Sequence, residues 1–243
     1  MKYPDKKIKS ISELVDRLKA DCNFYNGPIW FRGQTKKEYK LVPSFYRKAT
    51  AVSEMTLIKK FKQNASLLLS NNNSDDFEWL FIMQHHGVPT RLLDWTESSL
   101  VALYFACEDM FDKEGSLWVL LPNELNKHSS IEPDETYDIP GILELENYKP
   151  KNYHADRTNV MGPAAAIATR NTSRMQAQQG TFTIFHKKRT AIEDLGDKKH
   201  VWRYIIPPTS KKNILKELKL CGVDKFQLFP ELSSIGDTLK KIL

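Results

Sequence analysis

Apolar and polar residues alternate along the chain in patterns that predict a mixture of helices and strands. Helical spacing of apolar residues predicts a helix after the capping box at Ser10–Glu13, and further helices over 53–69, 77–86, 97–110, 211–220 and 233–243. Gly87 is expected to end the third of these helices, and Thr96 to cap the start of the fourth. Period-two and buried apolar runs predict strands at 29–33, 39–42, 91–93, 116–121, 181–186, 201–206 and 226–229.

The middle of the chain, residues 122–173, lacks such clear periods. It contains several prolines and scattered charges, and only the small residues 162–168 indicate the start of a short helix. A long irregular stretch inside a compact domain is often a functional loop. The sequence has no internal repeat and no obvious linker, so we predict one domain over residues 1–243 with a mixed α+β core.

Composition places the chain among ordinary soluble proteins. Hydrophobic residues make up 41% and charged residues 27% of the 243 positions. The net charge of +6 weakly favours an anionic partner such as a nucleic acid, although many basic proteins bind none. No apolar run approaches the length of a membrane span, and the first residues do not form a signal peptide. Three widely spaced cysteines give neither a metal nor a disulfide pattern, so a reducing cytoplasm is expected.

The stretch PIWFRGQ, residues 28–34, places Arg32 directly after the most hydrophobic residues of a predicted strand. A buried arginine costs several kcal/mol unless an anion meets it. The sequence leaves two partners open for Arg32: a carboxylate of the chain itself, such as Asp94 or Glu97, or a ligand.

The densest group of polar residues surrounds a predicted helix end, a short strand and a helix start. Such positions collect ligand groups, and the free N–H groups of a helix start suit a phosphate. Arg91 and Asp94 could instead pair with each other. His85 and His86 lack a carboxylate at metal spacing, so no metal is expected there. The group comprises Gln84, His85, His86, Thr90, Arg91, Asp94, Trp95, Thr96, Glu97 and Ser98.

A second candidate region precedes the strand predicted at 181–186. Three amides, those of Gln176, Gln178 and Gln179, stand just before Gly180, where they could read a base, an amide or a ribose, or could simply form a polar turn. Arg170 and Arg174 lie upstream and could face phosphates. The phosphate loop GxxxxGK[ST], the dinucleotide motif GxGxxG and the nucleophile motif GxSxG are all absent, so any nucleotide site must be built differently.

Several motifs in order give the chain a resemblance to the FRG domain, which is named for a Phe-Arg-Gly motif. They are WFRGQ, LVPSFYR and WLFIMQHHGVPTRLLDWTESSLVALYFA, with QQGTFTIF and LKLCGVDKFQLFPELSSIGDTLK later. The resemblance covers nearly the whole chain and is loosest at 122–170. A fainter resemblance extends to ADP-ribosyltransferases of the Arg–Ser–Glu type, which have an arginine on the first core strand, a Ser-Thr-Ser strand leading into a helix, and a glutamate at the mouth of a later strand. Arg32 resembles the first of these elements, residues 90–98 with VALYFA resemble the second, and QAQQGTF resembles the third. Glutamines occupy this third place, where that family has a catalytic glutamate.

These resemblances imply an ADP-ribosyltransferase-like α+β fold with two small packed sheets, and transfer of ADP-ribose from NAD, as substrate, to a nucleic acid, possibly RNA. They imply a toxin or phage-defence effector, which an antitoxin or chaperone could hold inactive. The alternative is a non-catalytic FRG module that binds a nucleotide, a nucleic acid or a protein partner, for example to inhibit a host enzyme. No metal cofactor is expected.

The resemblances also imply roles for individual residues. Arg32 would hold the pyrophosphate by a bidentate contact, and Gly33 would let the ligand approach the backbone. Asp94 or Glu97 would act as the base, and Gln178 would bond the ribose hydroxyls. The remaining candidates would shape the NAD site, with an aromatic ring stacked on nicotinamide or adenine; they are Thr90, Arg91, Trp95, Thr96, Ser98 and Tyr104.

Overall fold

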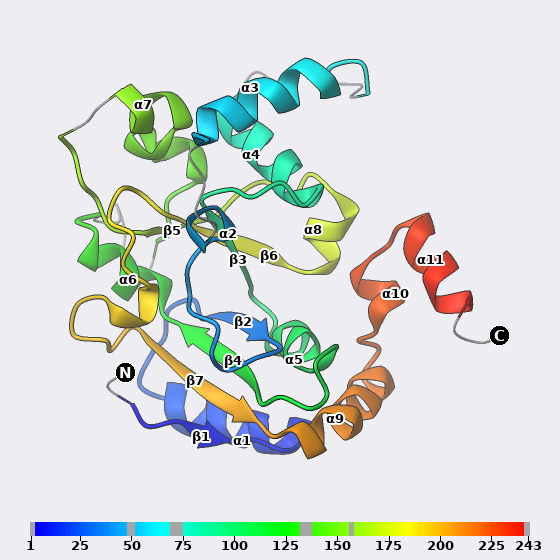
Figure 1. Cartoon of the computed structure of the whole chain (residues 1–243). Coiled ribbons are helices and arrows are strands. Elements are labelled where there is room, and N and C mark those ends of the chain that lie inside the picture. The colour runs from blue at the N-terminus through cyan, green and yellow to red at the C-terminus, as the bar shows by residue number, and fades with distance from the viewer. Residues whose placement is uncertain (1–2, 48–51, 69–74, 132–137, 156–157, 241–243) are drawn as a thin grey trace.

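The computed structural model describes residues 3–47, 52–68, 75–131, 138–155 and 158–240, and shows helices flanking a mixed β-sheet (Figure 1). The strands follow the spatial order β1-β7-β4-β2-β3-β6-β5. All neighbouring strands are antiparallel except β1 and β7, which are parallel. The predicted α+β class is therefore confirmed. The strand bounds are β1 (Lys6–Lys7), β2 (Trp30–Gln34), β3 (Leu92–Thr96), β4 (Gly115–Leu120), β5 (Ala164–Ala166), β6 (Gly180–Ile184) and β7 (Val201–Ile206).

The sheet consists of two halves that meet at a narrow junction. One half is β1-β7-β4-β2 and the other is β3-β6-β5. Within the halves the strands pair along their lengths; β3 and β6, for example, are paired from Leu92–Ile184 to Thr96–Gly180. Between the halves, β2 and β3 share one aligned pair, Phe31 with Thr96. The expectation of two small packed sheets was wrong: the described strands form one sheet, whose two halves are joined edge to edge.

Helices cover this sheet, and α1, α3, α4 and α11 begin within one residue of the predicted positions. Ser10 caps α1 by accepting a hydrogen bond from the Glu13 amide at 3.2 Å, and Ser53 caps α3 by accepting one from the Thr56 amide at 3.1 Å. The helices are α1 (Ile11–Cys22), α2 (Ser44–Arg47), α3 (Glu54–Ala65), α4 (Asp76–His85), α5 (Ser99–Cys107), α6 (Pro122–His128), α7 (Pro150–Ala155), α8 (Ser173–Ala177), α9 (Pro208–Leu220), α10 (Lys225–Leu228) and α11 (Leu232–Leu239), with 3₁₀ turns η1 (Ile142–Glu144), η2 (Glu146–Tyr148) and η3 (Ile192–Asp194).

Several predicted elements differ from the structure. Thr96 is the last residue of β3, and Ser98 caps α5 instead. Residues 226–228 are helical rather than extended, because Asp224 accepts a hydrogen bond from the Gln227 amide at 3.0 Å and starts α10. Residues 39–42 form no strand, and the segment 162–168 contains strand β5 rather than a helix. The helices predicted over 53–69 and 233–243 were drawn too long: α3 ends at Ala65 and α11 at Leu239, and residues 66–68 and 240 form turns. Their last predicted residues, 69 and 241–243, lie outside the described residues.

Two sets of helices cover the two halves of the sheet. Helices α1, α5 and α9 pack on the β1-β7-β4-β2 half, in a cluster that includes Phe31, Leu117 and Ile214. Helices α3 and α4 pack on the other half, in a cluster that includes Ile58 and Phe77. A third cluster contains side chains from β2, β4 and β3, so a continuous apolar core lies beneath the junction. Within the described residues, no helix is long and apolar enough to cross a membrane.

Candidate functional site

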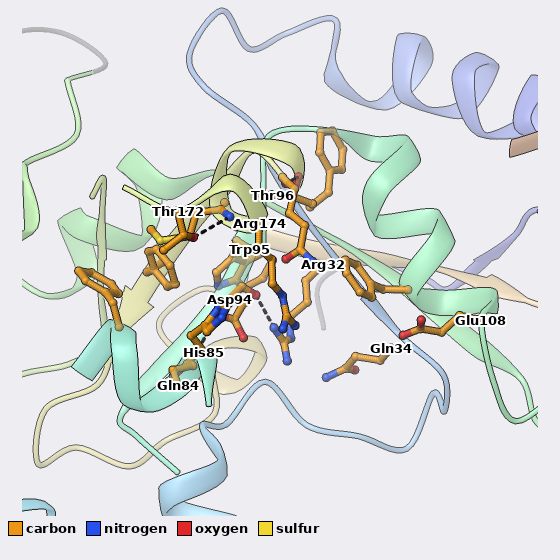
Figure 2. Close-up of a pocket in the computed structure, with 18 of the residues that line it drawn as sticks. Arg32, Gln34, Gln84, His85, Asp94, Trp95, Thr96, Glu108, Thr172 and Arg174 are labelled. Carbon is orange, nitrogen blue, oxygen red and sulfur yellow. Dashed lines mark hydrogen bonds between the residues drawn. The ribbon is translucent and has the colours of Figure 1, made fainter. Parts of the chain in front are cut away.

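A pocket of about 590 Å³ lies at the junction of the two halves of the sheet (Figure 2). Strands β2 and β3 provide Arg32 and Asp94, helix α4 provides His85, and helix α8 provides Arg174. The pocket mixes cationic, aromatic and amide side chains. Its lining includes Arg32, Gln34, Tyr39, Arg47, Phe81, Gln84, His85, His86, Asp94, Phe105, Glu108, Thr172, Arg174, Gln178 and Phe182.

Arg32 lies in the pocket with part of its hydrogen-bonding capacity unused. Its Nη1 donates to the backbone carbonyl of Asp94 (Figure 2). Its Nε is buried, and no described residue accepts a hydrogen bond from it. Burial lowers the pKa of Arg32, which the Asp94 carboxylate opposes and Arg47 reinforces, but a guanidinium remains charged in any case. A buried donor without an acceptor costs about 1–3 kcal/mol, so this position favours an anionic ligand.

A chain of hydrogen bonds holds Asp94 at the pocket. Its Oδ1 accepts from Gln84 Nε2 at 2.5 Å, and Gln84 Oε1 in turn accepts from the Thr90 hydroxyl. Thr90 is fully buried and does not line the pocket, and its hydroxyl also accepts from the Leu92 amide at 3.2 Å. Thr90 therefore positions Asp94 through Gln84 rather than contacting a ligand as expected.

The other two catalytic candidates lie in different surroundings. Glu97 forms an ion pair with Arg170 at 2.5 Å and is not part of the pocket lining. Gln178 lines the pocket, but its Nε2 donates to the Leu228 carbonyl at 3.1 Å, and its own backbone carbonyl accepts from the Thr96 hydroxyl at 2.7 Å. Of the predicted carboxylates, the structure thus brings only Asp94 to the pocket.

Arg91, which we expected at the cofactor site, is a structural residue. It is fully buried, and its Nε lies 2.6 Å from Glu54 Oε2 rather than near Asp94. Its Nη1 and Nη2 donate to the carbonyls of Phe185 and Tyr148 at 2.7 and 2.9 Å. The guanidinium is therefore paired by charge and by hydrogen bonds, away from the pocket.

Both aromatic residues expected to stack on the ligand belong to the core. Trp95 borders the pocket but is only 3% exposed, and its Nε1 donates to Thr183 Oγ1 at 3.0 Å. Tyr104 does not line the pocket, and burial raises its pKa to about 12. The aromatic surfaces of the pocket come instead from Tyr39, Phe81, Phe105 and Phe182.

Gly33 and Ser98 also have structural explanations. A Cβ atom on Gly33 would lie 1.9 Å from the Ala102 carbonyl oxygen, so this glycine allows α5 to approach β2 closely. That packing contact requires glycine; Gly33 also lines the pocket, so its expected contact with a ligand stays a prediction. Ser98 caps α5 by accepting from the Val101 amide at 3.4 Å and is absent from the pocket lining.

Sequence reasoning did not assign three charged residues of the pocket to the ligand site. Arg174 was only one of two arginines noted upstream of the glutamines; its guanidinium lies 4.7 Å from the centre of the Phe229 ring. Arg47 lies within the LVPSFYR motif, and this motif was the one feature of the sequence that could have indicated its place in the pocket. Glu108 follows the last turn of α5 and has no local signal. Although it is partly exposed, desolvation of its carboxyl group raises its pKa to about 7, with a smaller contribution from Asp109.

His85 and His86 also line the pocket. Burial and the nearby Arg174 lower the pKa of His85, which favours its neutral form, while Glu231 lies 3.8 Å from its Nε2. The pocket therefore carries three arginines, two carboxylates and two imidazoles, which suit a ligand with both anionic and aromatic parts.

The family model of the FRG domain matches residues 27–115. This part of the chain is therefore an FRG domain, and it contributes β2, α4, β3 and α5 to the pocket and its surroundings. The later motifs that resemble the family lie beyond the matched range. No curated protein matches the chain. No solved structure matches it either, so the resemblance to ADP-ribosyltransferases continues to rest on the motifs alone.

Proposed function

We propose that the pocket binds NAD and that the protein transfers ADP-ribose from it. The observation that carries this proposal is the buried, unpaired Nε of Arg32 in a pocket between two halves of a sheet. A pyrophosphate oxygen would give that donor an acceptor, and the planar guanidinium can bind a phosphate through two N–H groups.

The rest of the pocket matches the other parts of this ligand. Arg47 and Arg174 add positive charge for the two phosphates. Phe81 and Phe182, with ring centres 4.7 Å apart, and Phe105 offer surfaces for the flat nicotinamide and adenine rings. The amide of Gln34 or Gln84 can bond a ribose hydroxyl or the nicotinamide amide. A volume of about 590 Å³ lies in the range of small-molecule sites.

The proposed reaction breaks the bond between nicotinamide nitrogen and ribose C1′. The bonding electron pair goes to the pyridinium nitrogen, neutral nicotinamide leaves, and positive charge develops at C1′, as in glycoside cleavage. The Asp94 carboxylate stabilises this charge. A nucleophilic oxygen or nitrogen of the acceptor then bonds to C1′ and gives up its proton to Asp94 or to water. The net charge of +6 favours a nucleic acid, possibly RNA, as acceptor. The resemblance favours a toxin or phage-defence role.

Nicotinamide release from NAD in the presence of RNA, DNA or protein pools tests the reaction. Asp94→Asn should slow release by about 10²–10⁴-fold, the effect of a lost acid–base group, while NAD affinity changes far less. Glu97→Gln is the matched control, because it removes the same charge three residues away but outside the pocket, and it should retain activity. Equal effects of the two substitutions would remove Asp94 from the mechanism.

Salt dependence tests the nature of the acceptor. Lysines and arginines that bind a nucleic acid displace condensed counterions, so the affinity for RNA should fall by about 10³-fold or more from 50 to 200 mM salt if six or more phosphates are contacted. An affinity that hardly changes over this range would exclude a nucleic-acid acceptor, without affecting the NAD proposal.

A non-catalytic FRG module is the second candidate, and one observation favours it. Gln178 stands where the resembling transferases have a glutamate, and its amide is already bonded to the Leu228 carbonyl. A module of this kind would bind a nucleotide, a nucleic acid or a protein partner such as an antitoxin. If NAD binds but no nicotinamide is released with any acceptor pool, the non-catalytic module replaces the transferase as the proposed function.

A further inference from the structure

We propose that His128, Asp197 and His200 bind a Zn²⁺ ion that fixes the turn before β7 to the end of α6. One potential ligand atom from each of the three residues lies within 4.8 Å of the others. His128 Nε2 is 3.7 Å from Asp197 Oδ1, and the two imidazole rings have centroids 5.0 Å apart. None of the three residues lines the pocket, so the proposal is independent of the function proposed above.

His200 provides the strongest evidence that a cation belongs here. The residue is fully buried, and its Nε2 lies 2.9 Å from the Ile192 carbonyl oxygen. A carbonyl only accepts hydrogen bonds, so Nε2 carries the ring proton and Nδ1 presents a lone pair. This Nδ1 is buried, and no described residue donates to it. A metal-binding histidine typically has this arrangement, with one nitrogen held by a carbonyl and the other left for the metal.

The backbone of the turn brings the other two ligands close. Gly196 has φ of +49°, a left-handed conformation that favours glycine. A Cβ atom there would lie 2.2 Å from His128 Cε1, so only glycine leaves space for this imidazole ring. The Lys199 amide and Nζ donate to the Asp197 carboxylate at 3.0 and 2.8 Å, which orients this carboxylate beside the two histidines.

The donor set favours zinc over the alternatives. Imidazole nitrogens suit Zn²⁺, Cu²⁺ and Ni²⁺, whereas Mg²⁺ and Ca²⁺ prefer oxygen ligands alone. Two imidazoles and one carboxylate, with a water in the fourth position, bind zinc tetrahedrally, a set that is commoner in catalytic than in structural zinc sites. Metal–nitrogen distances of about 2.0–2.1 Å require the three side chains to move closer together by a small amount. His128 and Asp197 are partly exposed and can make that adjustment.

The position of the site indicates a structural role. The Leu121 amide donates to the His200 carbonyl at 2.8 Å, which ties the start of α6 to the end of the turn. His128 is the last residue of α6, so a metal would tie the other end of the helix to the same turn. In Figure 1 helix α6 lies beside the loop that leads into β7.

Calorimetric titration of metal-depleted full-length protein with ZnCl₂ tests the proposal. We expect one Zn²⁺ per chain and a higher melting temperature with zinc than with EDTA. His128→Gln and Asp197→Asn change partly exposed ligands and should leave the fold intact. Each should weaken zinc binding by more than about 10-fold, since even changes to residues behind the ligands cost 10–100-fold. X-ray absorption should show two imidazole ligands in the wild type.

Two control variants separate this site from adventitious binding. Glu124→Gln removes a neighbouring carboxylate on α6, and His154→Gln removes a histidine elsewhere; both should bind zinc as the wild type does. Failure of wild-type protein to bind zinc at one equivalent would overturn the proposal. So would binding that survives both His128→Gln and Asp197→Asn, because the metal would then lie at another site, such as His85 and His86.

Discussion

Arg32 lies in β2 and Arg91 lies directly before β3, yet their hydrogen bonds and ion pairs differ. Arg91 has a carboxylate partner in Glu54 and donates to two backbone carbonyls, so its charge and its geometry are satisfied within the fold. Arg32 donates to one backbone carbonyl and keeps a buried Nε without an acceptor. The comparison teaches that burial alone does not mark an arginine as functional. What separates the two residues is the unused donor of Arg32, and our proposal of a ligand at Arg32 rests on it.

The largest effect on stability is expected from breaking the Arg91 pair. Arg91→Met would leave the Glu54 carboxylate buried without a partner, which should lower the free energy of unfolding by about 3–5 kcal/mol in urea denaturation. The double variant Arg91→Met with Glu54→Leu should recover much of this loss, because it removes both buried charges. A single variant that lost less than about 1 kcal/mol would show that Arg91 is not the structural member of the comparison.

A smaller loss is expected at Gly33, next to Arg32 in the sequence. Gly33→Ala forces a methyl group against the backbone of α5 and should cost about 1–3 kcal/mol of unfolding free energy. Gly236→Ala is the control: a Cβ there meets nothing within 4 Å, and alanine favours a helix. If Gly33→Ala is as stable as wild type but loses NAD binding, Gly33 contacts the ligand and our packing explanation is wrong.

The smallest change in stability is expected at Arg32. Arg32→Ala removes one hydrogen bond together with a buried unpaired donor, so the unfolding free energy should change by less than about 1 kcal/mol. NAD binding, measured by calorimetry, should nevertheless be lost. Arg32→Lys should also fail to bind, because an ammonium group cannot make the planar two-point contact. An unfolded Arg32→Ala variant that Arg32→Lys restores would make Arg32 a second structural arginine.

Local signals in the sequence were sufficient for most of the fold. The helix after the Ser10 cap and the strand at 201–206 depend on neighbouring residues, and both lie where the pattern predicts; the helix predicted over 53–69 begins there but ends at Ala65. The run 226–229 was misassigned because its aromatic and apolar residues favour a strand, whereas the cap provided by Asp224 starts a helix there. The prediction of one domain over residues 1–243 stays a prediction.

The candidate site was less predictable, because it depends on contacts between distant parts of the chain. Arg32 was singled out because it follows apolar residues in a predicted strand, and Asp94 because it belongs to the densest polar group. The partner of Arg91 was missed because Glu54 lies 37 positions away in another helix. Glu108 was missed for a similar reason: its place at the pocket arises only when α5 packs on β2. Residue type thus identified the candidates, and tertiary contacts decided their roles.

The single Phe31–Thr96 pair between the two halves of the sheet has a mechanical consequence. Elsewhere in the sheet, ladders of successive hydrogen bonds resist twisting and shear. At the junction one aligned pair stands in place of such a ladder, and the bond from Arg32 to the Asp94 carbonyl also crosses it. The pocket lies across this line, with Arg32 on one side and Asp94 on the other. A ligand held by both residues would stiffen the sheet where its own backbone does so least.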